Sequence, residues 1–285
     1  MSAAISNILS LNSNIFVKME TISLLTPEMQ LFLVIVFALI FGSFASLISY
    51  RLASKQPMVF ARSHCVSCHK PLGIRNLIPL FSWIIQCGKC SFCKAKISWR
   101  YPLIELAFVA AFLTVYFTLD RHIDQKMILY FLITGTLIVM TIVDLEHFFI
   151  PDVAQYFLAF LVIILSITQG GPSAALINVK AAFLYMGFGL LLFAFFYFTV
   201  KVEAIGIDDI KFFFIAGLLL GTADFLAFMM ISGIIGVLFG TLWRHFKKEE
   251  IFPFAPALCT AMFLCMLFDK KINPVDLMGS MLFFQ

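Results

Sequence analysis

The sequence predicts an all-α polytopic membrane protein with about eight transmembrane helices and a cytosolic tetracysteine loop resembling a zinc ribbon. Hydrophobic residues make up 62% of its 285 positions and charged residues 13%, about half the charged share of a soluble domain. Long apolar runs approach the roughly 20 residues that a helix needs to cross a bilayer. Because these runs lack the alternation of a β-barrel, we expect helices to satisfy the backbone in lipid.

Turns and charged loops divide the apolar runs into eight expected spans. In chain order these spans are 29–50, 101–119, 127–143, 153–168, 181–200, 212–223, 225–243 and 251–268. The stretch 212–243 is too long for one crossing, and "GTAD" at 221–224 supplies a turn within it. The first 28 residues lack a basic start and precede a run too long for a signal peptide, so we expect no secretory signal.

The distribution of basic residues sets the expected orientation. Segment 51–100 carries nine Lys and Arg and no Asp or Glu, so the positive-inside rule places it in the cytosol. Alternating spans then bring 201–211 and 244–250 to the same side and leave both termini, 1–28 and 269–285, outside. Two interpretations of the positive charge in this loop remain. It either reflects only the positive-inside rule, or it also binds anionic lipid headgroups.

The cytosolic loop contains two C-x-x-C pairs, Cys65 with Cys68 and Cys90 with Cys93. Two such pairs can supply four tetrahedral thiolate ligands to zinc, and the reducing cytosol favours a metal site over disulfides. Four thiolates leave no open coordination position, so we expect this zinc to be structural. A competing pair, Cys87-x-x-Cys90, and a loop of reduced thiols are the alternatives. The two remaining cysteines, expected to pack inside the last span, are Cys259 and Cys265.

Two aspartates fall at cytosolic ends of expected spans. Asp144 ends the third span and Asp209 precedes the sixth, and the expected orientation rests on Lys and Arg alone. Two close carboxylates share a proton, so one can accept a proton from water while the other donates to a carbonyl oxygen. This is the chemistry of an aspartic peptidase. The alternative is that both acids sit in headgroup water or cap neighbouring helices.

Several neighbouring charged residues have simpler interpretations. Asp152 opens the fourth span, where an N-cap is expected. Glu105 either joins the cytosolic polar groups around the aspartates or pairs with Arg100. Lys211 either neutralises an anionic site or extends to the membrane interface.

An ordered set of motifs resembles one known family, the type IV prepilin peptidases, also called leader peptidase/N-methyltransferases. "VDLEHFFIPD" (143–152) is similar to the stretch bearing their first catalytic aspartate, and "GIDDIK" (206–211) resembles their G-x-G-D-x-K motif. The other similar segments are "GSFASLISYRL" (42–52), "NLIPLFSW" (76–83), "ISWRYPLIEL" (97–106) and "PFAPAL" (253–258). The set covers nearly the whole chain from residue 42.

The resemblance implies a membrane aspartic endopeptidase of the bacterial inner membrane. Asp144 and Asp209 would be its catalytic residues, supported by Gly206, Lys211 and Glu105, in a seven-helix core over 101–268. The implied substrates are prepilins and pseudopilins, whose basic leader is removed after a glycine at the cytosolic face; no nucleic acid is implied. The implied second reaction methylates the new N-terminus with S-adenosylmethionine.

This chain departs from the family pattern at three positions. Asp208 and Ala255 stand where the family usually has glycine, and Ser46 stands where it commonly has Asn. The region of Ser46 is associated with methyl transfer, so the resemblance supports the peptidase reaction more firmly than methylation.

Two functions of other classes also explain a membrane protein with this loop. One is a zinc-stapled, proton-coupled transporter that uses Asp144 and Asp209 as proton carriers, and the other is a noncatalytic assembly subunit. A transporter should show paired broken helices or repeated halves, and the sequence shows neither. An assembly subunit does not explain the aspartates. Leader release from a prepilin in detergent favours the peptidase over both.

Overall fold

The computed structural model describes residues 25–53, 63–119, 121–199, 201, 205–248 and 251–268. Helices dominate these ranges, and no β-strand element is assigned within them, which confirms the all-α class. The expected tail 269–285, most of the N-terminal segment and residues 54–62 of the cysteine loop lie outside the described part.

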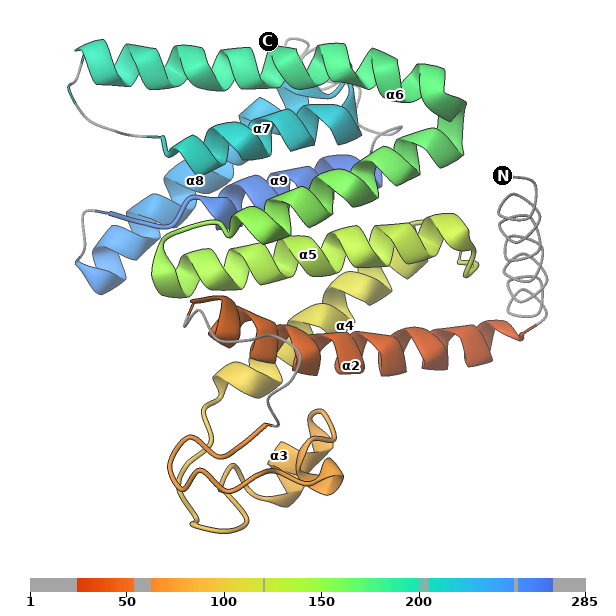
Figure 1. Ribbon diagram of the computed structural model, residues 1–285, viewed down its shortest axis with the longest axis vertical. Helices are drawn as coiled ribbons and strands as arrows, with labels where there is room; N and C mark the ends of the chain where they lie inside the picture. The colour runs from red at the N-terminus through yellow and green to blue at the C-terminus, as the bar shows by residue number, and fades with distance from the viewer. Residues whose placement is uncertain are drawn as a thin grey trace, which may run out of the picture. The chain divides into compact units, whose positions relative to one another are not determined.

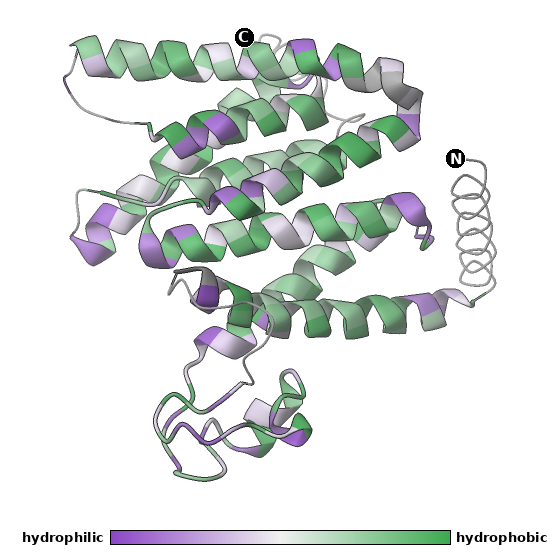
Figure 2. Cartoon of the chain, viewed as in Figure 1, coloured by the Kyte–Doolittle hydropathy of each residue, from purple (hydrophilic) through white to green (hydrophobic). Residues whose placement is uncertain are grey.

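The helices follow the order of the expected spans (Figure 1). Their bounds are α2 Pro27–Ala53, α4 Arg100–Thr118, α5 Gln125–His147, α6 Asp152–Thr199, α7 Ile207–Leu220, α8 Phe225–Lys247 and α9 Ala255–Phe268. The cysteine loop between α2 and α4 holds two short elements, the 3-10 turn η1 Ile74–Asn76 and α3 Phe81–Ile85. Apolar residues run along the long helices, and hydrophilic residues gather at several helix ends and in the cysteine loop (Figure 2).

Two glycines divide long apolar stretches. Gly171 has φ of 71° and breaks α6 into Asp152–Gly171 and Leu176–Thr199, which correspond to the fourth and fifth expected spans. Gly221 also has φ of 71° and ends α7, after which α8 begins at Phe225. Glycine adopts this left-handed backbone without the strain that a side chain would add. The expected division of 212–243 into two helices is therefore confirmed.

Six helical segments of the described residues are long and apolar enough to cross a membrane. The remaining two, α7 and α9, have 14 residues each, or about 21 Å of helix against a hydrocarbon core of roughly 30 Å. The expected last span is corrected at its start, since α9 begins at Ala255 rather than 251. Pro253 precedes the helix and Pro256 lies in its first turn, where a missing N–H costs no hydrogen bond.

The chain divides into two compact units. One comprises Met1–Ala45 and Arg62–Leu132, and the other comprises Ser46–Ala61 and Ile133–Gln285. The first contains most of α2, the described part of the cysteine loop, α4 and the start of α5, and the second contains the rest of α5 and α6 to α9. The two candidate aspartates both belong to the second unit.

The most extensive helix packing in the described part of the second unit joins α7 to α6, which lie side by side in Figure 1. A Cβ added at Gly217 would lie 2.6 Å from the Cα of Ala182 and 2.8 Å from the carbonyl oxygen of Ala181. The Asn178 side chain donates to the Leu218 carbonyl at 3.0 Å. Small residues and an interhelical hydrogen bond are what membrane helices use to approach one another. This contact fixes α7, and therefore Asp209, against α6.

We predict that Gly217→Ala lowers stability, whereas Gly233→Ala does not. The added methyl at position 217 meets backbone atoms that cannot rotate away, at a cost of about 1–3 kcal/mol. At Gly233 of α8 the same methyl meets no atom within 4 Å, and alanine favours a helix over glycine. Thermal unfolding of both variants in detergent measures the difference; a Gly217→Ala variant as stable as Gly233→Ala would contradict the packing described here.

Candidate functional site

Asp144 lies in the last turn of α5 and is only 5% exposed. Its Oδ2 accepts a hydrogen bond from the backbone N–H of Ala255 at 2.8 Å. Ala255 is the first residue of α9, whose initial N–H groups have no partner within their own helix and carry the positive end of the helix dipole. The α9 N-terminus thus holds a carboxylate that would otherwise be costly to bury.

Asp209 lies in the first turn of α7 and is half-buried. Its Oδ2 accepts a hydrogen bond from the Gly206 N–H at 3.0 Å, so the acid caps its own helix, as the simpler interpretation allowed. Gly206 is the N-cap residue, and a Cβ there would approach Asp209 Oδ2 to 3.3 Å. A side chain at position 206 would therefore press on the carboxylate.

The structure brings Asp144 and Asp209 together from separate helices. Each carboxylate lies within electrostatic range of Asp208, and Asp209 is also within range of Asp144. The buried thiol of Cys259, on α9, is within range of both candidate aspartates and hydrogen-bonds to Thr141. Three carboxylates therefore occupy one end of this unit, where the ends of α5, α7 and α9 meet.

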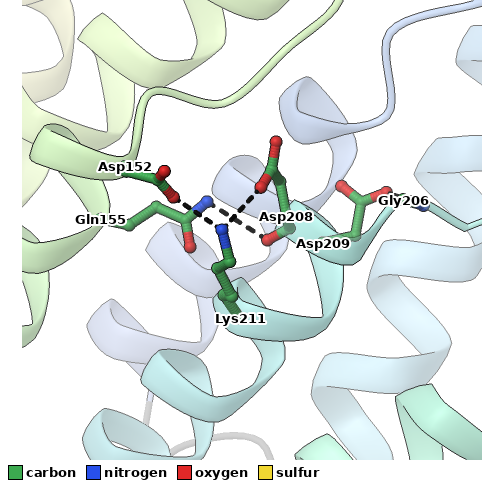
Figure 3. A network of polar contacts seen from close by, with 6 residues as sticks. All are labelled: Asp152, Gln155, Gly206, Asp208, Asp209 and Lys211. Atoms are coloured by element: carbon green, nitrogen blue, oxygen red, sulfur yellow. Dashed lines mark hydrogen bonds and ion pairs between the residues drawn. The ribbon is translucent and has the colours of Figure 1, made fainter.

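Lys211 makes two ion pairs beside this carboxylate cluster (Figure 3). Its Nζ lies 2.7 Å from Asp152 Oδ1 and 3.0 Å from Asp208 Oδ1. The sequence leaves two roles open for Lys211, neutralising an anionic site or extending to the membrane interface. The two ion pairs favour the first. Asp152, interpreted from the sequence as an N-cap, directs its carboxylate to Lys211.

Gln155 is a site residue that the sequence reading missed. It is 1% exposed on α6, and its Nε2 donates to the backbone carbonyl of Asp208 at 3.3 Å. The sequence signal for Gln155 is that it is a lone amide in an apolar run, one turn after Asp152. Its bond ties the first turn of α6 to the first turn of α7.

Glu105 lies in the other unit, where it contacts the cysteine loop. It is buried on α4, and its Oε2 accepts the backbone N–H of Leu80 at 2.7 Å. Leu80 has φ of 57° and directly precedes α3. A Cβ at Gly42 of α2 would lie 2.8 Å from the Cα of Glu105, so α2 approaches α4 closely at this acid. The geometry described here makes Glu105 an anchor for the loop.

The two cysteine pairs sit in matching backbone turns, offset by 25 residues. In each turn the first cysteine's N–H bonds to the carbonyl five residues later, from Cys65 to Lys70 and from Cys90 to Ala95. In each, the fifth residue has a positive φ, 54° at His69 and 60° at Lys94. Cys87 has no place in this repeat. The expected equivalence of the two C-x-x-C pairs therefore extends to the backbone.

The four sulfur atoms of Cys65, Cys68, Cys90 and Cys93 all lie within 4.8 Å of one another. The sulfurs of Cys65 and Cys93 are 3.9 Å apart, and two thiolates on tetrahedral zinc are separated by about 3.8 Å when each Zn–S bond is roughly 2.3 Å. Backbone N–H groups of Cys68 and Ser67 lower the pKa of the Cys65 thiol to about 6. The Ala95 N–H lowers the pKa of the Cys93 thiol, but desolvation and the neighbouring thiols of the cluster raise it to about 11, so it is donor type and spacing that fit a zinc ion.

Two tryptophans pack against one another in the loop, although Trp99 remains 66% exposed. Trp83 and Trp99 lie with ring centroids 4.2 Å apart, and Trp83 Nε1 donates to the Ile97 carbonyl. Gly88 adopts φ of 64°, and a Cβ there would lie 2.9 Å from the Trp83 ring. This packing brings the second cysteine turn against the indole of Trp83.

Two family models match successive segments of the chain. The bacterial Peptidase A24 N-terminal domain matches residues 36–119, and the type IV leader peptidase family matches residues 129–241. The chain belongs to the type IV leader peptidase family. It is thus a peptidase and a multi-pass protein of the bacterial inner membrane.

Curated relatives are similar over most of their length. The Prepilin leader peptidase/N-methyltransferase of Bacillus subtilis is 29% identical over 85% of this chain and 96% of its own. The protein of the same name from Aeromonas salmonicida is 27% identical over 87% of this chain and 94% of its own. The Type 4 prepilin-like proteins leader peptide-processing enzyme of Escherichia coli O78:H11 is 29% identical over 72% of this chain and 75% of its own. No solved structure matches the chain.

We predict about one zinc per chain, because four thiolates complete one tetrahedral site. Serine at any one of the four clustered cysteines should release the metal and lower the temperature of unfolding, since binding free energy contributes to the folding of such sites. Cys87→Ser is the matched control and should keep the metal. Elemental analysis of freshly purified protein measures the content; metal-free wild type, or zinc lost from Cys87→Ser alone, would contradict the assignment.

Proposed function

We propose that this chain is an aspartic endopeptidase that removes the leader from type IV prepilins and pseudopilins. The observation that carries the proposal is the pair of carboxylates, Asp144 and Asp209, brought together from α5 and α7 within electrostatic range. The names of the curated relatives supply the substrate class.

The proposed reaction needs one proton shared between the two acids. The ionised carboxylate accepts a proton from a water molecule, whose oxygen attacks the carbonyl carbon of the scissile peptide. The protonated acid donates to the carbonyl oxygen, and the tetrahedral intermediate then breaks to a carboxylate and a protonated amine. Both enzyme acids act by proton transfer, so no covalent intermediate is required.

The position of the pair suits a substrate that combines a basic leader with an apolar helix. Asp144 is in the last turn of a candidate membrane span, and Asp209 directly precedes the apolar stretch of α7. The peptide between leader and helix would reach the same depth when the apolar helix enters the bilayer. We propose cleavage after glycine at the cytosolic boundary, as the family resemblance implies.

The ribbon-like loop would hold its zinc through Cys65, Cys68, Cys90 and Cys93. Four protein thiolates fill the tetrahedral shell, so the ion would supply structural stability. The bond between Leu80 and Glu105 would transmit that stability to α4.

Methyl transfer from S-adenosylmethionine to the new N-terminal amine is the second proposed activity. It is supported by the names of the Bacillus and Aeromonas relatives. Ser46, in the segment that the resemblance associates with methylation, is 2% exposed. Mass spectrometry of the mature pilin tests this activity separately, because correct cleavage with an unmethylated amine would assign the chain to cleavage alone.

We predict that Asp144→Asn and Asp209→Asn each lower prepilin cleavage by about 1,000-fold or more, because a lone carboxylate cannot serve as acid and base together. Both variants should still insert and fold. Asp124→Asn is the matched control, because Asp124 accepts the Met127 N–H at the start of α5 and asparagine caps a helix as well as aspartate does. Leader release by purified protein in detergent is the measurement. Activity retained in Asp209→Asn but lost in Asp208→Asn would reassign the second acid.

We predict that a thiol probe at His245 is labelled from the cytosol and one at Ala223 only from outside. Both positions are exposed; Ala223 lies just before α8 and His245 lies in its last turn. The helix crosses once if its basic end at 244–248 faces inward. An impermeant maleimide applied to intact cells and to inverted vesicles, with the modified peptide identified by mass spectrometry, measures the orientation. External labelling at position 245 would contradict the eight-span topology, in which α7 and α8 cross separately, although Asp144 and Asp209 could still share one face.

A further inference from the structure

Asp208 adds a third carboxylate to the site. It stands next to Asp209, at the position where the family resemblance places glycine, and its charge acts on both candidate catalytic acids. Like charges this close oppose one another's ionisation. A free Asp208 carboxylate would therefore disturb a reaction that needs one proton shared between two acids.

Asp208 has a cationic partner of its own, Lys211. Its Oδ1 lies 3.0 Å from Lys211 Nζ, and the same ammonium contacts Asp152 at 2.7 Å. Figure 3 shows the ammonium between Asp152 and Asp208, with the Asp209 carboxylate turned to the opposite side toward Gly206. The two adjacent acids of α7 thus have different partners.

We propose that Lys211 is a positioning residue that pairs with Asp208 and holds it beside Asp152, which limits the effect of the Asp208 charge on Asp144 and Asp209. This inference rests on the proposed peptidase function. It assigns Lys211 an effect on the charge of the site, and it explains how this chain accommodates an acid at a position where its family usually has glycine.

Other contacts keep α6 and α7 together without the ammonium. Gln155 Nε2 bonds to the Asp208 carbonyl, Asn178 bonds to the Leu218 carbonyl, and Gly217 packs on Ala181 and Ala182. A Lys211→Met variant should therefore fold. Its main consequence would be two carboxylates, Asp152 and Asp208, without their shared cation.

The charged and titratable groups facing this network come from each of the helices around it. Asp144 of α5, Asp208 of α7 and the Cys259 thiol of α9 face Asp209. Asp152 of α6 and Asp208 face Lys211. Removing the ammonium leaves negative charge beside the catalytic pair, which retains its protons more strongly and reaches the singly ionised form at higher pH.

The test is a double-mutant series read as kcat/KM for prepilin cleavage against pH. Lys211→Met should move the acidic limb of the profile upward by about one pH unit, which lowers kcat/KM about tenfold at pH values well below the limb and less near neutral pH. Lys211→Arg should keep the acidic limb of the profile at its wild-type pH, because arginine keeps the positive charge. Lys211→Met with Asp208→Asn should return the limb toward wild type, because the uncompensated acid beside Asp209 is gone. Lys180→Met, at an exposed lysine of α6, is the control and should leave the profile unchanged.

The outcomes separate the two proposals. Wild-type protein that leaves prepilin intact would overturn the peptidase function itself. Active wild type with an unshifted profile in Lys211→Met would overturn only the role of Lys211. Activity lost in Lys211→Met and not recovered with Asp208→Asn would also overturn it, since Lys211 would then act only as a clamp between α6 and α7.

Discussion

Backbone N–H groups at two helix N-termini hold the acids on which this site depends. The Ala255 N–H at the start of α9 binds Asp144, and the Gly206 N–H at the start of α7 binds Asp209. A buried carboxylate is costly in an apolar protein unless donors and opposite charge compensate it. Helix N-termini supply both without a further side chain. The two acids can therefore lie within electrostatic range of one another at one end of this unit.

This constraint explains why two short helices belong to the site. Both α7 and α9 begin at the carboxylates, and neither reaches the length of a full crossing. Each is fixed elsewhere by close packing, as at Gly217 of α7 against α6. The rigid part of the bundle thus fixes the positions of the two N-termini, and the N-termini position the acids. Lys211 adds charge balance to this backbone arrangement.

The cysteine loop depends on other interactions than the packed helices do. Apolar burial in a short loop is limited: Trp83 and Trp99 contact one another, but Trp99 is largely exposed. Four sulfurs within 4.8 Å of one another provide a site where a metal could supply the missing stability. Glu105 connects this loop to α4 through the Leu80 backbone.

Much of the fold could be predicted from the sequence, because lipid allows few solutions for an apolar chain. Hydrophobic run lengths indicated the helices, and the turn at Gly221 indicated the division between α7 and α8. The start of α9 at Ala255 is harder to predict from the sequence, because the apolar run continues through the irregular residues before the helix. The hydrogen bond from Ala255 to Asp144 could not be predicted, since it joins residues 111 positions apart. The second partner of Lys211, Asp152, depends in the same way on how α6 packs on α7.

The central claim is that one proton is shared between two acids, and the pH dependence of wild-type cleavage tests it most directly. The measurement is kcat/KM for leader release from a purified prepilin, which reports ionisations of the free enzyme. The account predicts a bell-shaped profile, with activity falling when both carboxylates are protonated and again when both are ionised. A profile that rises through a single limb and stays level into the alkaline range would contradict it, because the reaction would then proceed without a protonated acid.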